Sequence, residues 1–220
     1  MPRRRGRVVV AAGTNGAGKS ATAGEFLAAR AEGIYFNPDL AARAMVEKDG
    51  LTLAEANARA WNLGFDLLNR SIDRNEDFSF ETTLGGNSIA QALMRAASAG
   101  LEIFVFYVGL DSPDRHIARV AARVLRGGHP IPAQRIRERY PKSLANLIKL
   151  LAYAAEARVY DNSDESDDGL PRARLVLSMS RGQIVKPPLD ELVATAPEWA
   201  KPVAAAAIRI HRRHGAYRPA

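Results

Sequence analysis

The sequence predicts an α/β fold: a three-layer sandwich with a mostly parallel central sheet and a helical lid. A β-branched run at residues 8–10 leads directly into a glycine-rich loop and then a helical pattern. The segment 101–108 is apolar enough to lie in the middle of a parallel sheet that is covered on both faces. Strand-like and helical segments alternate along the chain, which is typical of parallel sheets. Because the 220 residues contain no domain-splitting linker, we expect a single domain over residues 1–220.

The glycine-rich loop has the pattern of a phosphate-binding P-loop, Gly13-x-x-x-x-Gly18-Lys19-Ser20, and the helical pattern after it runs to residue 30. Glycines allow successive backbone N–H groups to converge on one point, and the helix adds the positive end of its dipole. Lys19 can reach the β- and γ-phosphates of a nucleotide, and the Ser20 hydroxyl can bind Mg²⁺. The sequence therefore predicts a nucleotide site, with Ser20 as metal ligand, formed by Gly13, Thr14, Asn15, Gly16, Ala17, Gly18, Lys19, Ser20 and Ala21.

A second short strand is predicted at residues 34–36, followed at once by a helix. Asn37 suits the N-cap position and Pro38 the first helical position, which places Asp39 in the first turn. Two interpretations of Asp39 stay open. It can simply complement the helix dipole. Alternatively, it projects from the carboxyl edge of the sheet, where ligands bind in open α/β folds, and accepts a proton from a substrate hydroxyl.

A long helix is predicted from the capping-box pattern at residues 52–55, and it fades near Asn75. Trp61 lies among its apolar positions. We interpret Trp61 as a core residue or the wall of a groove rather than a chemical group.

A third strand is predicted at residues 78–80, where aromatic residues alternate, and polar residues follow it. Glu81, Thr82 and Thr83 come before two glycines, and a helix is expected from about residue 88 to residue 99. Polar residues at a strand end can merely face water. Because this layout repeats that of Asp39, however, we interpret Glu81 and Thr83 as candidate site residues.

Two arginine-rich helices follow the strand at 101–108. The first begins at Ser112-Pro113 and carries Arg115, Arg119 and Arg123, which share one face because they are four residues apart. Such a stripe can be an ordinary solvated face, but beside a P-loop we favour a lid that contacts phosphate. The second helix begins at Pro132 with arginines that oppose the helix dipole, namely Arg135, Arg137 and Arg139. A strand ending near residue 161, a hairpin at 174–185 and an outer Ala-rich helix at 197–213 complete the prediction.

Composition excludes several functions. The chain has no cysteine, which removes disulfides, thiolate catalysis and Cys-ligated zinc and is compatible with a cytoplasmic location. Its longest apolar run is far too short to cross a membrane. The four histidines have no metal-ligand spacing.

The net charge of +7 belongs to the two ends of the chain. Eight arginines and no acid lie in residues 1–7 and 209–220, so residues 8–208 carry a net charge of −1. We expect both tails to be flexible. Solvated tails are the simpler interpretation, and attraction to nucleic acid is expected only through them.

Together, several motifs between residues 7 and 185 resemble the zeta-toxin-like branch of the P-loop kinases. The motifs that carry this resemblance, in order, are the P-loop at 13–20, Asn37-Pro38-Asp39, Phe80-Glu81-Thr82-Thr83-Leu84, Leu110-Asp111-Ser112-Pro113, Arg119-Val120-Ala121-Ala122-Arg123-Val124, Gly127-Gly128-His129 and Tyr160-Asp161-Asn162-Ser163. The resemblance implies a P-loop NTPase fold of the kinase type, with ATP and Mg²⁺ as cofactors.

The resemblance also implies an activity. Zeta toxins transfer the γ-phosphoryl group of ATP to the sugar of UDP-N-acetylglucosamine, and a small antitoxin protein inhibits them. By this likeness Asp39 is the base that accepts the hydroxyl proton, and Glu81 and Thr83 face the acceptor or the metal. Arg119 and Arg123 become lid arginines that, with Lys19, stabilise charge on the transferred group.

Two alternatives to a small-molecule kinase stay open. A kinase acting on polynucleotide ends or another cofactor would use the basic tails. An ATP-hydrolysing switch would need no acceptor, but the sequence lacks the apolar strand with paired acidic residues that is typical of such proteins.

Overall fold

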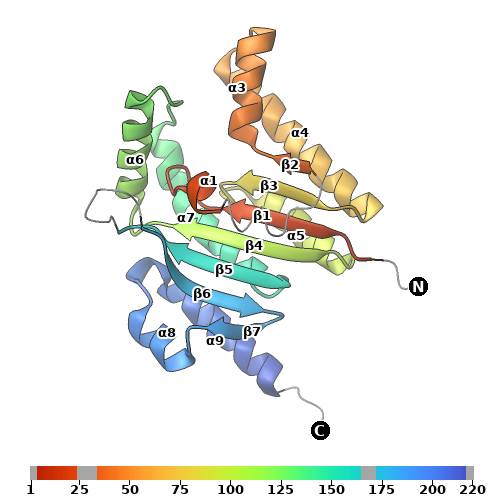
Figure 1. Cartoon of the computed structure of the whole chain (residues 1–220), viewed down its shortest axis with the longest axis vertical. Helices are drawn as coiled ribbons and strands as arrows, with labels where there is room; N and C mark the ends of the chain where they lie inside the picture. The colour runs from red at the N-terminus through yellow and green to blue at the C-terminus, as the bar shows by residue number, and fades with distance from the viewer. Residues whose placement is uncertain (1–3, 24–33, 165–171, 217–220) are drawn as a thin grey trace.

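The computed structural model describes residues 4–23, 34–164 and 172–216 (Figure 1). Its strands are β1 (Arg7–Ala12), β2 (Ile34–Phe36), β3 (Phe78–Thr82), β4 (Glu102–Gly109), β5 (Glu156–Asp161), β6 (Arg174–Ser180) and β7 (Gln183–Lys186). Its helices are α1 (Lys19–Thr22), α3 (Pro38–Asp49), α4 (Leu53–Arg74), α5 (Asn87–Ser98), α6 (Pro113–Leu125), α7 (Ala133–Leu150), α8 (Leu189–Thr195), the 3₁₀ turn η1 (Glu198–Ala200) and α9 (Lys201–Ala216).

The strands form one sheet in the order β2-β3-β1-β4-β5-β6-β7. Strands β1 to β5 pair in parallel, and β6 and β7 extend the sheet as an antiparallel hairpin. The prediction of an α/β fold with a mostly parallel sheet is confirmed. Since β1 lies between β3 and β4, Ala11 pairs with Glu81 on one side and with Phe106 on the other. This register places the end of β3 beside the loop that follows β1.

The side chains of β1 alternate between the two faces of the sheet. Val8 and Val10 join the larger core, which lies under α4, α5, α7 and α9. Val9 and Ala11 join a smaller cluster on the face that carries α1 (Figure 1). A strand buried on both faces explains the unbroken apolar run of this segment. The predicted continuation of the first helix to residue 30 lies outside the described residues.

Local sequence signals account for the starts of three helices. The Asn37 side chain accepts hydrogen bonds from the N–H groups of Asp39 and Leu40, so α3 begins where Pro38 predicts. Thr52 and Glu55 form a reciprocal capping box at the start of α4. At the start of α6 the Ser112 side chain accepts a hydrogen bond from the N–H group of Arg115. These caps satisfy backbone donors that would otherwise lack partners.

The C-terminal part differs from the prediction. Helix α8 was not expected. Helix α9 buries one face in the main core through Val203, Ala204 and Ala207, while its other face is exposed. Just before α9, Trp199 is only 7% exposed and covers Gly109 of β4. A Cβ atom at Gly109 would lie 2.4 Å from the Trp199 ring, so only glycine fits under it.

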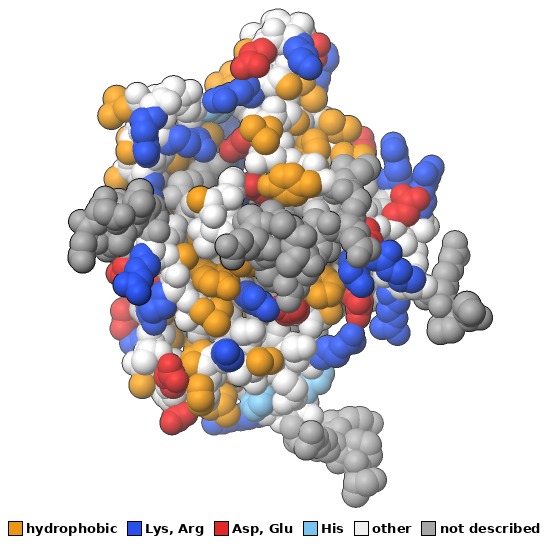
Figure 2. Space-filling model, viewed as in Figure 1, with side chains coloured by type: hydrophobic (Ala, Val, Ile, Leu, Met, Phe, Trp, Pro, Cys, Tyr) orange, Lys and Arg blue, Asp and Glu red, His pale blue; other side chains and the backbone are white. Residues whose placement is uncertain are grey.

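Parts of both basic tails have regular structure. Arg7 begins β1, Arg4 forms a salt bridge of 2.8 Å with Asp77, and residues 209–216 belong to α9. Residues 1–3 and 217–220 lie outside the described residues. On the face shown in Figure 2, Lys and Arg side chains lie in several separate places with Asp and Glu between them.

Candidate active site

The loop between β1 and α1 packs so closely on its neighbours that glycines are required. Gly13 has a φ of 141°, and a Cβ there would lie 2.1 Å from the Val108 carbonyl oxygen of β4. Gly18 has a φ of 87°, and a Cβ there would lie 2.6 Å from Nδ2 of Asn162. Both angles favour glycine. The loop is therefore held between the ends of β4 and β5.

Asn162 fixes this loop from the end of β5. Its Nδ2 donates a hydrogen bond of 2.8 Å to the Ala17 carbonyl oxygen, and both residues are buried. Its Oδ1 is buried and accepts no hydrogen bond from the described residues. Asp161 and Ser163 on either side of it hydrogen-bond to each other, which fixes the turn. The sequence alone does not predict this contact, because Asn162 and Ala17 are 145 positions apart.

Two polar groups of the loop fit a bound phosphate. Lys19 Nζ donates a hydrogen bond of 2.8 Å to the Gly13 carbonyl oxygen, and burial lowers the pKa of the Lys19 amine. The Thr14 hydroxyl is buried without a hydrogen-bond partner among the described residues. Buried polar groups normally have partners. An anion in the concave face of this loop would supply them, as the P-loop pattern predicts.

Glu81 lies next to the loop and accepts two hydrogen bonds on one oxygen. Ser20 Oγ donates to Glu81 Oε1 at 2.9 Å, and the Tyr35 hydroxyl donates to the same oxygen. Glu81 is 7% exposed. A hydroxyl and a carboxylate are the hard oxygen groups that suit Mg²⁺. Ser20 and Glu81, which the sequence placed in separate motifs, are thus brought together.

Asp39 lines the same cavity as Asn15 of the loop and lies near an arginine of α6. Its Oδ2 is 3.9 Å from Nη1 of Arg123, and its side chain is 56% exposed. Arg123 also donates a hydrogen bond of 2.9 Å to the His129 carbonyl oxygen, which ties α6 to the glycine break after it. The fold therefore brings the predicted base and one predicted lid arginine together.

The other arginines divide into two groups. Arg115 pairs with Asp111 at 2.9 Å, and Arg137 pairs with Asp114 at 2.6 Å, so these two belong to surface ion pairs. Arg139 donates a hydrogen bond of 2.8 Å to Oδ1 of Asn15 in the loop. Arg119 lies on α6 with its terminal nitrogens buried.

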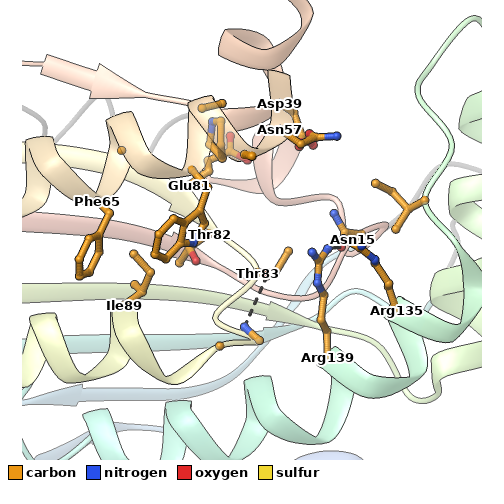
Figure 3. Close-up of a pocket in the computed structure, with 18 of the residues that line it drawn as sticks. Asn15, Asp39, Asn57, Phe65, Glu81, Thr82, Thr83, Ile89, Arg135 and Arg139 are labelled. Carbon is orange, nitrogen blue, oxygen red and sulfur yellow. Dashed lines mark hydrogen bonds between the residues drawn. The ribbon is translucent and has the colours of Figure 1, made fainter. Parts of the chain in front are cut away.

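A cavity of about 770 Å³ adjoins these groups. Figure 3 shows its apolar end at Phe65 and Ile89 and its cationic end at Arg135 and Arg139 beside Asn15. Between the ends lie the predicted site residues Asp39, Glu81 and Thr83. Trp61 stacks on Phe65 with ring centroids 5.1 Å apart and forms part of the wall, as one of its two interpretations expects. The cavity therefore has room for a small molecule next to the phosphate loop.

His116 on α6 packs against the loop and is 1% exposed. Its Nδ1 lies 2.9 Å from the Asn15 carbonyl oxygen, which can only accept, so the ring donates from Nδ1. Burial, together with the nearby cations Lys19 and Arg119, lowers the pKa of His116 to about 4. His116 therefore stays neutral at physiological pH.

We expect His116 to make stability depend on pH. Its pKa is about 4 in the folded state and 6.5 when unfolded, so only the unfolded state takes up the proton between these values. Stability should therefore fall by about 3 kcal/mol as the pH drops from 6.5 to 4. Urea unfolding at several pH values measures this. In His116→Gln the free energy of unfolding should depend much less on pH between 4 and 6.5, whereas His129→Gln should keep the dependence of the wild type. An unchanged pH dependence in His116→Gln would contradict the assignment.

The strand order and the loop geometry define a P-loop kinase-like fold. A family model described as "Zeta toxin" matches residues 1–168. The chain belongs to the zeta toxin family, which is a family of toxin-type ATP-dependent kinases, and the resemblance seen in its motifs is confirmed. Within the described residues, no helix has the length and apolar character needed to cross a bilayer.

Relatives and solved structures agree with this fold. An uncharacterized protein of Haemophilus influenzae is 31% identical over 137 residues, which span 58% of this chain and 88% of the relative. The AvrRxo1-ORF1:-ORF2 complex with ATP superimposes with a TM-score of 0.61 at 13% identity, over 95% of this chain and 76% of that one. The PezAT chromosomal toxin–antitoxin system of Streptococcus pneumoniae superimposes with a TM-score of 0.53 at 13% identity, over 98% of this chain and 88% of that one. At these identities the two structures show similarity of fold alone.

Proposed function

We propose that this protein transfers the γ-phosphoryl group of ATP to a hydroxyl of a small molecule bound in the cavity beside the P-loop. One observation carries the proposal: a single cavity is lined by Asn15 of the phosphate loop and by Asp39, with Glu81 between them. A phosphoryl donor on the loop and a hydroxyl acceptor in the cavity would meet at Asp39. Positioning of this kind provides most of the catalysis in phosphoryl transfer.

Each residue has a proposed role. The loop N–H groups of residues 13–21 and Lys19 hold the phosphates, and Ser20 with Glu81 holds Mg²⁺, which neutralises phosphate charge when bound. Asp39 accepts the proton of the acceptor hydroxyl. Arg119 and Arg123 stabilise negative charge on the transferred group. Thr83 contacts the acceptor, and Arg139 joins the cationic end through its hydrogen bond to Asn15.

UDP-N-acetylglucosamine is the proposed acceptor, and a small antitoxin protein is the proposed partner. Membership of the zeta toxin family supports both. The cavity volume of about 770 Å³ lies in the range of small-molecule sites. We further propose that residues 1–220 act as one domain in the cytoplasm.

An ATP-consumption assay with and without UDP-N-acetylglucosamine tests the proposal, with the product analysed by mass spectrometry. We expect a phosphorylated sugar nucleotide from the wild type and none from Lys19→Ala. ATP binding without this product would reject the acceptor and direct the search to other hydroxyl compounds. A protein that does not bind ATP would overturn the proposed function.

A further inference from the structure

Tyr35 lies beside Glu81 and belongs to none of the motifs found in the sequence. It lies on the edge strand β2, where its Cα pairs with Ser79 of β3, two residues before Glu81. The residue is 43% exposed, but its hydroxyl turns inward and donates to Glu81 Oε1. Burial and the bond to Glu81 raise the pKa of the Tyr35 phenol. In this bond the hydroxyl is the donor, because an ionised carboxylate oxygen can only accept.

The Glu81 carboxylate depends on such donors. It is buried and forms no salt bridge with any described residue. The Lys19 amine interacts with it electrostatically without forming a salt bridge, so hydrogen bonds must replace much of the hydration that burial removes. Two hydroxyls, from Tyr35 on β2 and from Ser20 on α1, provide these bonds, and both meet at Oε1. The position of this oxygen is thus fixed from two sides.

The direction of these bonds has a chemical consequence for Ser20. A serine hydroxyl that donates its proton to a carboxylate turns its lone pairs away from that carboxylate, where they can face a cation. Partners that orient a ligand in this way are an essential part of metal sites. Glu81 therefore orients the Ser20 oxygen, and Tyr35 holds Glu81 in the place where it does so.

We propose that Tyr35 is a positioning residue that, through Glu81, presents the Ser20 oxygen to the Mg²⁺ bound with ATP. The inference rests on the proposed function, because it needs Mg²⁺-dependent nucleotide binding at the P-loop. It concerns the hydroxyl of Tyr35 and not its ring. A role limited to joining β2 to β3 would predict a loss of stability and no specific effect on metal.

The variant Tyr35→Phe removes the hydroxyl and keeps the ring. Calorimetric titration with ATP, once in excess Mg²⁺ and once in EDTA, separates the metal-dependent part of binding. We expect the Kd of Mg·ATP to rise about tenfold in Tyr35→Phe, while the Kd of ATP in EDTA stays within twofold of wild type. Tyr153→Phe is a matched control: Tyr153 is 44% exposed and does not line the active-site cavity. It should change neither constant.

A double-mutant cycle tests whether Tyr35 acts through Glu81. Glu81→Gln alone should weaken Mg·ATP binding, and adding Tyr35→Phe should weaken it by less than a further twofold, because the positioned group is already altered. Thermal melting of each variant checks that it is folded.

The outcomes separate the two proposals. Independent, multiplicative effects of the two substitutions would overturn the inference, and so would a Tyr35→Phe protein with unchanged Mg²⁺ dependence. Equal weakening in Mg²⁺ and in EDTA would assign Tyr35 a purely structural role. ATP binding by the wild type that does not respond to Mg²⁺ would instead overturn the proposed function together with this inference.

Discussion

Replacement of Asp39 by asparagine should lower kcat by about 10²–10⁴-fold, the range expected for loss of a general base. The change removes the proton acceptor and keeps the shape of the side chain. The α3 N-cap should survive, because Asn37 makes the capping bonds to the N–H groups of Asp39 and Leu40. ATP binding should remain close to that of the wild type.

Steady-state turnover and calorimetric ATP binding, measured on the same preparation, check this expectation. Asp190→Asn is a suitable control because Asp190 also lies in the first turn of a helix, α8, and does not line the cavity. That variant should have the turnover of the wild type. Normal turnover by Asp39→Asn would remove Asp39 from the role of base.

Replacement of Lys19 by methionine should lower kcat/KM for ATP by about 10²–10³-fold, as expected when one preorganised donor to a developing charge is lost. Lys19 Nζ is already held against the loop by the Gly13 carbonyl oxygen, so little reorganisation is needed when phosphate binds. The methionine side chain keeps the length and loses the charge.

Binding and turnover should both fall in Lys19→Met, in contrast to Asp39→Asn, where binding persists. Lys48→Met, at the exposed end of α3, controls for loss of one positive charge and should behave as the wild type. A Lys19→Met protein with undiminished ATP affinity and turnover would refute the proposed phosphate role of this loop.

Local signals explain why much of the fold could be predicted. The caps at Asn37, Thr52 and Ser112 each involve residues within three positions, so their patterns are visible in the sequence. The rule that ligands bind at the carboxyl edge of a parallel sheet was enough to group Asp39 with Glu81. Both residues do line one cavity.

The remaining features depend on contacts between distant segments. The Tyr35 hydroxyl reaches Glu81 only because of the register between β2 and β3. Arg139 donates a hydrogen bond to Asn15, 124 positions away, whereas Arg137 pairs with Asp114 on α6. The packing of α7 determines which of these arginines reaches the phosphate loop. Glu81 was predicted as a site residue, but its hydrogen bond to Ser20 depends on the register between β1 and β3 and is not visible in the sequence.

The small side chains of α9 show that composition alone does not predict how closely a helix packs. The Ala-rich pattern predicted a helix packed on the outside, and small residues also allow such a helix to approach its neighbours closely. Val203, Ala204 and Ala207 lie in the main core for this reason. Composition alone could not distinguish these two situations.

Trp199 covers Gly109 but does not line the cavity, so its role is structural and not catalytic. Among the described residues, the cavity lining ends at Arg139, and the family match ends at residue 168. Strand β4, which contacts the phosphate loop, is nevertheless covered by Trp199, thirty-one positions beyond the end of that match. Substitutions in residues 172–216 therefore leave every proposed site residue unchanged, provided that an aromatic ring of similar size still covers Gly109 of β4.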